Sequence, residues 1–203
     1  MHVTKSTIPN GGKVVWESIL DEVPGGVSLK VARLDYLTVN TNVDKRFLPT
    51  GTPVYVDLAA RTADVCKSAT ALTGTTAQAI RVAKNNHWKV GDFVNDGTTS
   101  SAISSITTTE DGYDTLNTAE ALTSAAGTKY GEGSVSGGST AMAYTPNGMT
   151  KDTVWMGDGN ADAAIVKIGT ARADALTFPI TSIYAIALRG GVAGTGTSLI
   201  TLV

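Results

Sequence analysis

The chain has 203 residues, of which 42% are hydrophobic and only 17% are charged, and its formal net charge is −2. This charge gives no field that would attract nucleic acid, and the basic residues are scattered rather than clustered. Cys66 is the only cysteine, which excludes an intrachain disulfide. No stretch reaches transmembrane length without Gly, Ser, Thr or charge, so we expect neither nucleic acid nor a membrane as a partner.

The fold class predicted from composition is mainly β. Thr, Ala, Gly and Ser are abundant, apolar segments are short, and turn dipeptides are frequent. We therefore expect small β-barrel or sandwich modules with short helical turns at most, arranged as one large domain or as two to three small ones. The first apolar segment, Lys13–Leu20, is too short for its periodicity to separate a strand from a two-turn helix.

A rigid turn is predicted where two prolines flank a glycine in Leu48–Pro53. It leads into a strand with Val54 and Val56 on one face and Tyr55 and Asp57 on the other.

The stretch from Ala79 to Thr118 predicts four short strands separated by turns, as in a small β-barrel. Asn95–Gly97 is a strong turn signal between the second and third strands. Ile103 and Ile106 are three residues apart, so a strict period of two fails there, and a bulge is expected.

The rest of the chain gives weaker signals. Helix-favouring residues in Thr118–Ala126 predict one short helix. The glycine- and serine-rich stretch Gly131–Thr140 is typical of a linker or an exposed loop. Ile180–Leu188 is predicted as a strand, too apolar for a solvated edge and therefore covered by another sheet or subunit. The terminal strand Leu199–Val203 must be paired.

Three polar features invite a functional interpretation. Asp158–Asp162 begins like a calcium loop but lacks the glycine and the glutamate that such loops require, so we expect a solvated hairpin loop. His87 is a lone histidine without a partnering nucleophile, and we expect it on the barrel surface. Cys66 has no local nucleophile signature and is expected to be a small buried or half-buried residue.

Paired glycines and dispersed aromatic residues are the remaining candidates. The pairs Gly131/Gly133, Gly157/Gly159 and Gly194/Gly196 lack the third glycine or the lysine of phosphate loops, and we expect loop glycines. The aromatic residues are evenly spread, which favours core and interface anchors over a sugar-stacking platform. They are Trp16, Trp88, Trp155, Tyr36, Tyr113, Tyr130 and Tyr144.

Part of the chain resembles a known family. The segments Thr76–Lys84, Trp88–Val94 and Tyr113–Leu116, with the two isoleucines between them, are similar to head fibre proteins of tailed phages of Bacteroides-type hosts, crAss-like phages in particular. The stretch Leu48–Val56 is similar to phage capsid decoration proteins. This resemblance implies a homotrimeric virion protein on the capsid surface, made in the host cytoplasm and bound to a capsid protein.

The turns and the composition of the chain divide it into four expected regions, and the resemblance suggests their roles. Residues 1–68 form an N-terminal β-rich region that anchors to the capsid, and residues 69–130 form the small barrel-like module. Residues 131–150 form a linker or long loop, and residues 151–203 form a C-terminal β-rich region that supports oligomerisation.

The alternative function is a carbohydrate- or receptor-binding module of a phage or surface adhesin, with a host glycan as partner. It predicts a clustered aromatic shelf around Trp88 or Trp155. An enzyme is not expected, because no nucleophile stands in register with a base. We assign no catalytic, cofactor-binding or metal-binding residue.

Overall fold

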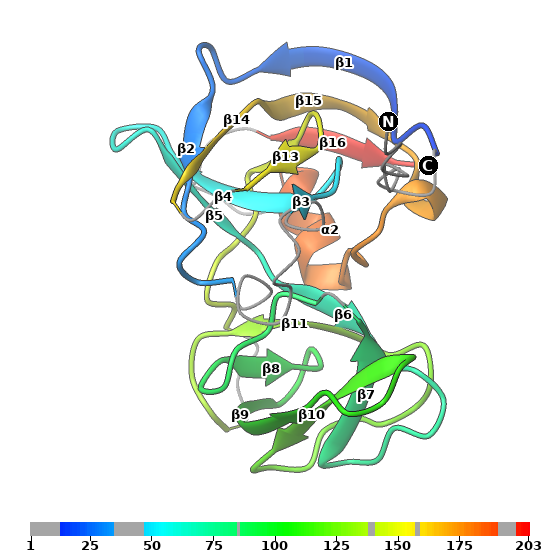
Figure 1. The fold of residues 1–203 in the computed structure, drawn as a ribbon. Helices are drawn as coiled ribbons and strands as arrows, with labels where there is room; N and C mark the ends of the chain where they lie inside the picture. Colours follow the sequence, from blue (N-terminus) through cyan, green and yellow to red (C-terminus); the bar gives the residue numbers. More distant parts are fainter. Residues whose placement is uncertain (1–12, 35–46, 85, 138–140, 157–158, 191–197) are drawn as a thin grey trace, which may run out of the picture.

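The computed structural model describes residues 13–34, 47–84, 86–137, 141–156, 159–190 and 198–203, which form two β-rich lobes stacked end to end (Figure 1). We call the described residues of 13–67 and 141–203 the sheet lobe, and residues 68–137 the barrel lobe. The prediction of a mainly β fold is confirmed.

The sheet lobe is built on an eight-stranded sheet in the order β1-β15-β12-β4-β5-β2-β14, with β16 also pairing with β15. A separate two-stranded sheet pairs β3 (Phe47–Leu48) with β13 (Val154–Trp155). The first and the last of the described strands, β1 and β16, both lie in the large sheet. Its strands are β1 (Trp16–Glu22), β2 (Val27–Leu29), β4 (Pro53–Asp57), β5 (Thr62–Val65), β12 (Gly148–Thr150), β14 (Ala161–Ala163), β15 (Ile165–Ala171) and β16 (Leu199–Leu202).

Two strand predictions in this lobe are confirmed. In β4, Val54 and Val56 are buried whereas Tyr55 is half-buried and Asp57 is exposed, as the alternation predicts. The terminal strand β16 runs parallel to β15, and Ile200 at its centre is fully buried. For the segment Lys13–Leu20, the sequence could not separate a strand from a helix. The structure has the strand β1 there, which pairs antiparallel with β15 along its whole length.

The strand predicted at Ile180–Leu188 is wrong, because the chain forms the helix α2 (Ser182–Leu188) there, shortly after the 3₁₀ turn η3 (Ala173–Ala175). The Thr181 hydroxyl accepts a hydrogen bond from the Tyr184 N–H at 3.2 Å, which caps the helix. Tyr184 and Leu188 are buried on one helix face, whereas Ile186 is 56% exposed on the other. The apolar run therefore covers the sheet of its own chain.

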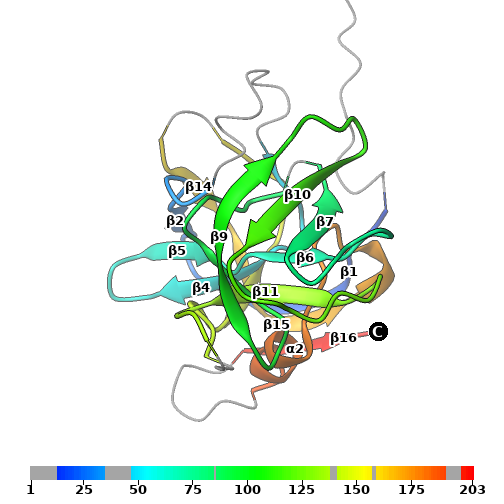
Figure 2. The same cartoon turned by 90° about the horizontal axis from the view of Figure 1, so that it is seen from below.

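The barrel lobe is a curled six-stranded sheet in the order β6-β11-β8-β9-β10-β7 (Figure 2). Its two end strands approach each other, since the Leu72 N–H donates to the Arg81 carbonyl at 2.8 Å. Tyr130, Trp88 and Leu116 are almost fully buried inside it. The strands are β6 (Ser68–Thr70), β7 (Ala79–Ala83), β8 (Phe93–Asn95), β9 (Ser100–Thr107), β10 (Tyr113–Thr118) and β11 (Lys129–Gly133).

Four strands lie between Ala79 and Thr118 as predicted, β7 to β10, but the second is confined to Phe93–Asn95, and residues 87–92, expected as its first part, are not a strand. The expected bulge is also present, because Asn117 pairs with Ser105 while Thr118 pairs with Ile103. The extra residue keeps Ile103 buried and leaves Ile106 packed at the edge of the same core.

The helix predicted at Thr118–Ala126 is wrong. Thr118 ends β10, and residues 119–126 are irregular. Their backbone groups are used by distant partners: the Leu122 N–H donates to the Ala77 carbonyl at 2.8 Å, and the Thr123 N–H donates to the Asp96 carboxylate at 2.8 Å. These tertiary hydrogen bonds outweigh the weak helix propensity.

The barrel lobe is inserted into the sheet lobe between β5 and β12. Strands from the expected regions 1–68 and 151–203 consequently share one sheet. Residues 131–150 contain the end of β11, buried at Gly131–Gly133, and the fully buried β12. Each lobe has its own hydrophobic clusters, and none of the clusters among the described residues spans both lobes.

Candidate functional site at the lobe junction

The junction forms where the chain leaves the sheet lobe and returns to it. Lys67 follows β5 and precedes β6, and Glu132 lies in β11, which pairs with β6. The Glu132 N–H donates to the Lys67 carbonyl at 3.1 Å, and the Ala143 N–H donates to the Glu132 carbonyl at 2.9 Å. The outgoing and returning segments are therefore bound directly to each other.

Lys67 places a charged group in the centre of this junction. Its side chain is only 1% exposed, and its ammonium group is ion-paired with the Asp92 carboxylate. The same Nζ lies 3.7 Å from Oε1 of Glu132. Because a buried ammonium group without counter-charges would be very costly, the two carboxylates of the barrel lobe offset the cost of burying Lys67.

Arg33 and Asp64 extend the ion pairs into the sheet lobe. The Arg33 guanidinium donates to Oε1 of Glu132, lies 3.6 Å from Oδ1 of Asp64 and stacks 4.1 Å from the ring centre of Tyr144. Lys30 donates to Asp64 at 3.0 Å. Cations and carboxylates thus alternate across the boundary between the lobes.

The electrostatic balance of the junction is visible in two pKa values. Burial raises the pKa of Glu132, although Lys67 and Arg33 act in the opposite direction. Burial by itself lowers the pKa of Arg33, but the charge and hydrogen bond of Glu132 outweigh it and the pKa is raised. The junction therefore fixes one mutual geometry of the lobes at the cost of desolvating several charges.

Tyr184 of α2 connects the same point to the helix. Its hydroxyl donates to the Lys67 carbonyl at 3.1 Å and accepts from the Glu132 N–H at 3.2 Å. Burial raises the pKa of Tyr184 well above its ordinary value, so the hydroxyl keeps its proton and remains a donor. The neighbouring thiol of Cys66 is also buried and has a raised pKa, which confirms the expectation of a small buried residue.

The surface position predicted for His87 is wrong. His87 is only 2% exposed, and its ring lies 4.2 Å from that of Phe178 of the sheet lobe. Burial, followed by the positive charge of Lys67, lowers the pKa of His87 from 6.5 to about 3. The burial of His87 could not be predicted from its neighbours in the sequence. The residue that covers it, Phe178, precedes α2 and lies far away along the chain.

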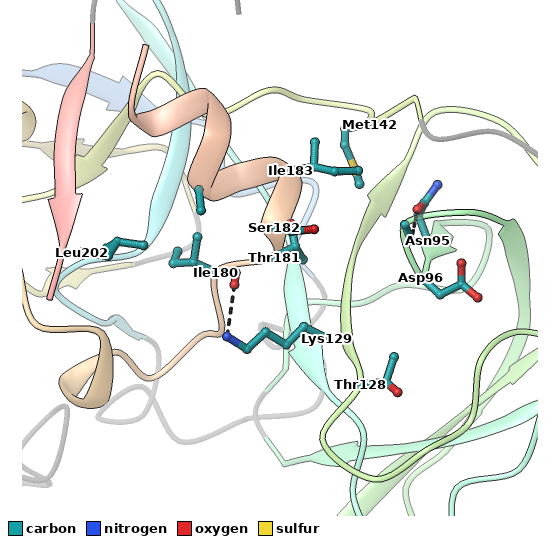
Figure 3. Close-up of a pocket in the computed structure, with 12 residues that line it drawn as sticks. Asn95, Asp96, Thr128, Lys129, Met142, Ile180, Thr181, Ser182, Ile183 and Leu202 are labelled. Carbon is teal, nitrogen blue, oxygen red and sulfur yellow. Dashed lines mark hydrogen bonds between the residues drawn. The ribbon is translucent and has the colours of Figure 1, made fainter. Parts of the chain in front are cut away.

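A groove of about 500 Å³ opens beside the junction (Figure 3). One wall comes from the barrel lobe, including Asn95, Asp96 and Lys129, and the other from the sheet lobe, including Ile183 and Leu202. Lys129 crosses the groove and donates to the Ile180 carbonyl at 3.3 Å. Since its walls belong to different lobes, the width of this groove depends on how the lobes are held together.

Asp96 stiffens the barrel wall of the groove. Its carboxylate accepts hydrogen bonds from the backbone N–H groups of Thr98, Thr99 and Thr123 and from the Thr98 hydroxyl. Burial opposes ionisation, but these donors outweigh it and lower the pKa of Asp96. The ionised carboxylate of Asp96 therefore stabilises the turn by accepting these hydrogen bonds.

The cation-loop candidate falls partly outside the described residues, which exclude Gly157 and Asp158. Asn160 is exposed, and Asp162 is exposed in β14. Within the described ranges, no group of three or more His, Cys, Asp and Glu side chains is arranged to hold a metal ion.

The paired glycines and the aromatic residues have mixed outcomes. Gly131 and Gly133 are buried in β11 rather than in a loop; the pair Gly194/Gly196 and Tyr36 lie outside the described residues. An aromatic shelf at Trp88 is contradicted, because Trp88 is 1% exposed inside the barrel lobe. Trp155 is 53% exposed and its ring lies 5.4 Å from that of Phe47.

The charged residues of the junction were missed by sequence reasoning. A signal was available at Lys67, which stands between the apolar Val65–Cys66 and the small residues of β6. Glu132 was hidden in a glycine-rich stretch typical of a linker. A charged residue within or next to a buried strand is the pattern that identifies such a cluster.

Comparisons with protein families, with curated proteins and with solved structures found no match for this chain. In the described part of the chain, no helix is long and apolar enough to cross a membrane.

Proposed function

We propose that the chain is a structural protein of a phage virion, a head fibre or capsid decoration protein that acts by docking and self-association. The resemblance of Thr76–Leu116 to head fibre proteins motivates this proposal. The observation that carries it furthest is the uneven distribution of exposed apolar side chains between the lobes.

Nine large apolar side chains are exposed among the described residues, and seven of them lie on the sheet lobe. Exposed apolar groups of this size mark protein–protein contacts when they gather on one part of a molecule. The seven are Val14, Leu20, Leu58, Trp155, Ile186, Leu199 and Val203; Val90 and Val135 are on the barrel lobe. The sheet lobe is therefore the docking end, and the barrel lobe projects outward.

Sedimentation with capsids that lack this protein tests the orientation. Leu20→Asp and Leu199→Asp place a charge on exposed positions of β1 and β16. We expect them to weaken capsid binding about tenfold or more, the scale of a lost interface anchor. The matched variants Val90→Asp and Val135→Asp should bind like the wild type.

Loss of binding in the barrel-lobe variants alone would reverse the orientation. A wild-type protein that binds no particle would overturn the proposed function altogether. If the protein does bind, electron cryo-microscopy of the decorated particle would show where each lobe lies relative to the capsid.

Self-association is the second part of the proposal, and the family resemblance implies three copies. Light scattering of the purified protein is expected to give the mass of three chains. The helix face that carries Ile186 adds a docking surface without charge, since residues 175–188 contain no charged side chain. A strictly monomeric protein that also fails to bind capsids would contradict the proposal.

Glycan binding remains the alternative function, and one pair of residues favours it. Exposed Trp155 on β13 and half-buried Phe47 on β3 form an aromatic pair with an interplanar angle of 58°. An aromatic face can stack on a sugar ring. A glycan array in which the wild type binds and Trp155→Ala does not would support this function, whereas no signal for the wild type would remove it.

A further inference from the structure

Lys67 differs from the other lysines that form ion pairs in the described part of the chain, because only its side chain is fully buried. It is 1% exposed, against 28% for Lys84 and more for Lys30 and Lys151. Its Nζ lies 2.5 Å from Oδ2 of Asp92. The junction therefore holds an amine and a carboxyl group in direct contact and away from bulk water, which is the arrangement from which an amide bond can form.

A second carboxyl group lies beside this pair. Oε1 of Glu132 is 3.7 Å from Nζ of Lys67 and also accepts a hydrogen bond from Arg33. Oε2 of Glu132 is buried and has no hydrogen-bond partner among the described residues. Burial raises the pKa of Glu132. This carboxyl group can thus take up a proton from its neighbour inside the folded protein and release it again, as a general acid–base does.

Hydrogen bonds to the backbone hold all three groups in place. The Lys67 carbonyl accepts from the Glu132 N–H at 3.1 Å and from the Tyr184 hydroxyl at 3.1 Å. The Lys89 N–H donates to Oδ2 of Asp92 at 2.6 Å, where it stabilises the negative charge that develops on this oxygen during attack on the carboxyl carbon. Groups fixed in this way reach effective molarities of about 10⁵–10⁸ M, which favours a condensation that is unfavourable between free molecules in water.

We propose that Lys67 and Asp92 condense to an intramolecular isopeptide bond, with Glu132 as the proton carrier. Nζ gives a proton to Glu132 and then, as a neutral amine, forms a bond to Cγ of Asp92. The bond between Cγ and Oδ1 breaks, and this oxygen leaves as water. Of the three protons of the ammonium group, one stays on the amide nitrogen and two leave in the water, so Glu132 ends in its initial state. The step needs no oxidant, metal or cofactor.

The bond closes a loop between two residues that are 25 positions apart in the sequence. Lys67 stands where the chain leaves the sheet lobe, and Asp92 directly precedes β8 of the barrel lobe. Tension that enters the barrel lobe at Lys67 then reaches Asp92 through a covalent bond, without first separating β6 from β11. The link also limits the freedom of the unfolded chain, as a disulfide does. It is independent of the proposed virion function, because its chemistry depends only on these side chains.

Mass spectrometry of the purified full-length chain under denaturing conditions tests the bond. After incubation at neutral pH, the wild type is expected to be lighter than the mass calculated from its sequence by one water molecule. Trypsin does not cleave after a lysine whose amine forms an amide, so we expect a branched peptide of residues 62–81 joined to residues 90–129. The full calculated mass would overturn the proposal. So would loss of water without the branched peptide, which is the result of succinimide formation at Asp111–Gly112.

Two variants test the assigned roles. Lys67→Arg keeps a positive charge but has no amine that can condense, and Glu132→Gln keeps an oxygen for Arg33 but cannot carry the proton. Both are expected to have the full calculated mass, with circular dichroism to show that they are folded. A branched peptide that forms as fast in folded Glu132→Gln as in the wild type would overturn the role of Glu132.

Lys84 and Asp114 are a matched control within the same chain. Their Nζ and Oδ1 atoms are 2.7 Å apart, but Lys84 is partly exposed and forms no ion pair with a second carboxylate among the described residues. Trypsin should therefore cleave completely after Lys84 in the wild type, and Lys84→Arg should still lose one water molecule. A link at Lys84 equal to that at Lys67 would contradict the proposal, because proximity alone would then explain the reaction.

Discussion

The two lobes pair their strands in different ways. In the barrel lobe, β9 pairs with its sequence neighbours β8 and β10, and short turns connect them. In the sheet lobe, β1 pairs with β15 and β2 pairs with β14, so the first described strands meet strands near the end of the chain. The barrel lobe can therefore form from one continuous segment, whereas the sheet lobe requires both ends of the chain.

This difference in strand pairing indicates which parts of the molecule unfold as cooperative units. Each lobe buries its own apolar residues, and the junction between them is mostly polar. Substitutions in a lobe interior, in the junction and in an exposed turn should therefore affect different cooperative units. The four tests below separate these units, from the largest expected effect to the smallest.

Lys67→Met tests the junction itself. Removing the buried ammonium group leaves the carboxylates of Asp92 and Glu132 without their shared counter-charge. We expect the free energy of unfolding to fall by about 3–5 kcal/mol, as when one partner of a buried ion pair is removed. Urea unfolding measures it. Lys151→Met, which breaks an ion pair with Glu22 at 2.8 Å on the surface, should change the free energy of unfolding far less, because solvent screens that pair.

Leu116→Ala and Ile165→Ala compare the two lobe interiors. Both side chains are fully buried, the first in β10 and the second in β15. Each truncation should cost about 2–5 kcal/mol. If the lobes are separate units, calorimetry will show that each variant lowers the transition of its own lobe. One common transition, shifted equally by both variants, would show that the lobes unfold together.

Gly169→Ala tests the long-range pairing of the sheet lobe. A Cβ at Gly169 would lie 2.6 Å from the Ser18 carbonyl oxygen of β1, which is too close without a backbone shift. We expect a loss of about 1–3 kcal/mol from this overpacking, measured by urea unfolding. At Gly112 of the barrel lobe, an added Cβ would meet no atom within 4 Å. Gly112→Ala should therefore be close to neutral.

Asp96→Asn tests a local turn of the barrel lobe. The folded protein lowers the pKa of Asp96 below 3.8, so its carboxylate stabilises the fold above that pH and the contribution is lost as the pH falls. The variant should lose about 1 kcal/mol at pH 7, as for other capping side chains, and the difference should vanish in strong acid. Asp111→Asn, in an exposed turn, is the control. An equal loss in both variants would contradict the special role of Asp96.

The local part of the fold could be predicted from the sequence. The strands between Ala79 and Thr118 alternate regularly, and turn signals such as Asn95–Gly97 separate partners that lie next to each other along the chain. The alternation of Val54 and Val56 likewise reports one buried face. In these segments, each strand pairs with a strand that lies close to it in the sequence, so the local alternation of apolar residues is enough to predict it.

Long-range partners explain what could not be predicted. Six consecutive hydrophobic residues, Ile183–Leu188, form most of α2, and seven helical residues are too few for their periodicity to distinguish a helix from a strand. Nothing near His87 in the sequence announces that Phe178 will cover it. The ion pairs between Arg33 and Glu132 join residues that are 99 positions apart. No local pattern could report them.

The path of the chain through the junction makes the barrel lobe exchangeable. The chain departs at Lys67 and comes back at Glu132, and these two residues are hydrogen-bonded to each other. A different compact domain whose own ends lie close together would fit the same opening without disturbing the order of β4, β5 and β12. Recombination can thus exchange the inserted lobe while the strand order of the sheet lobe is kept.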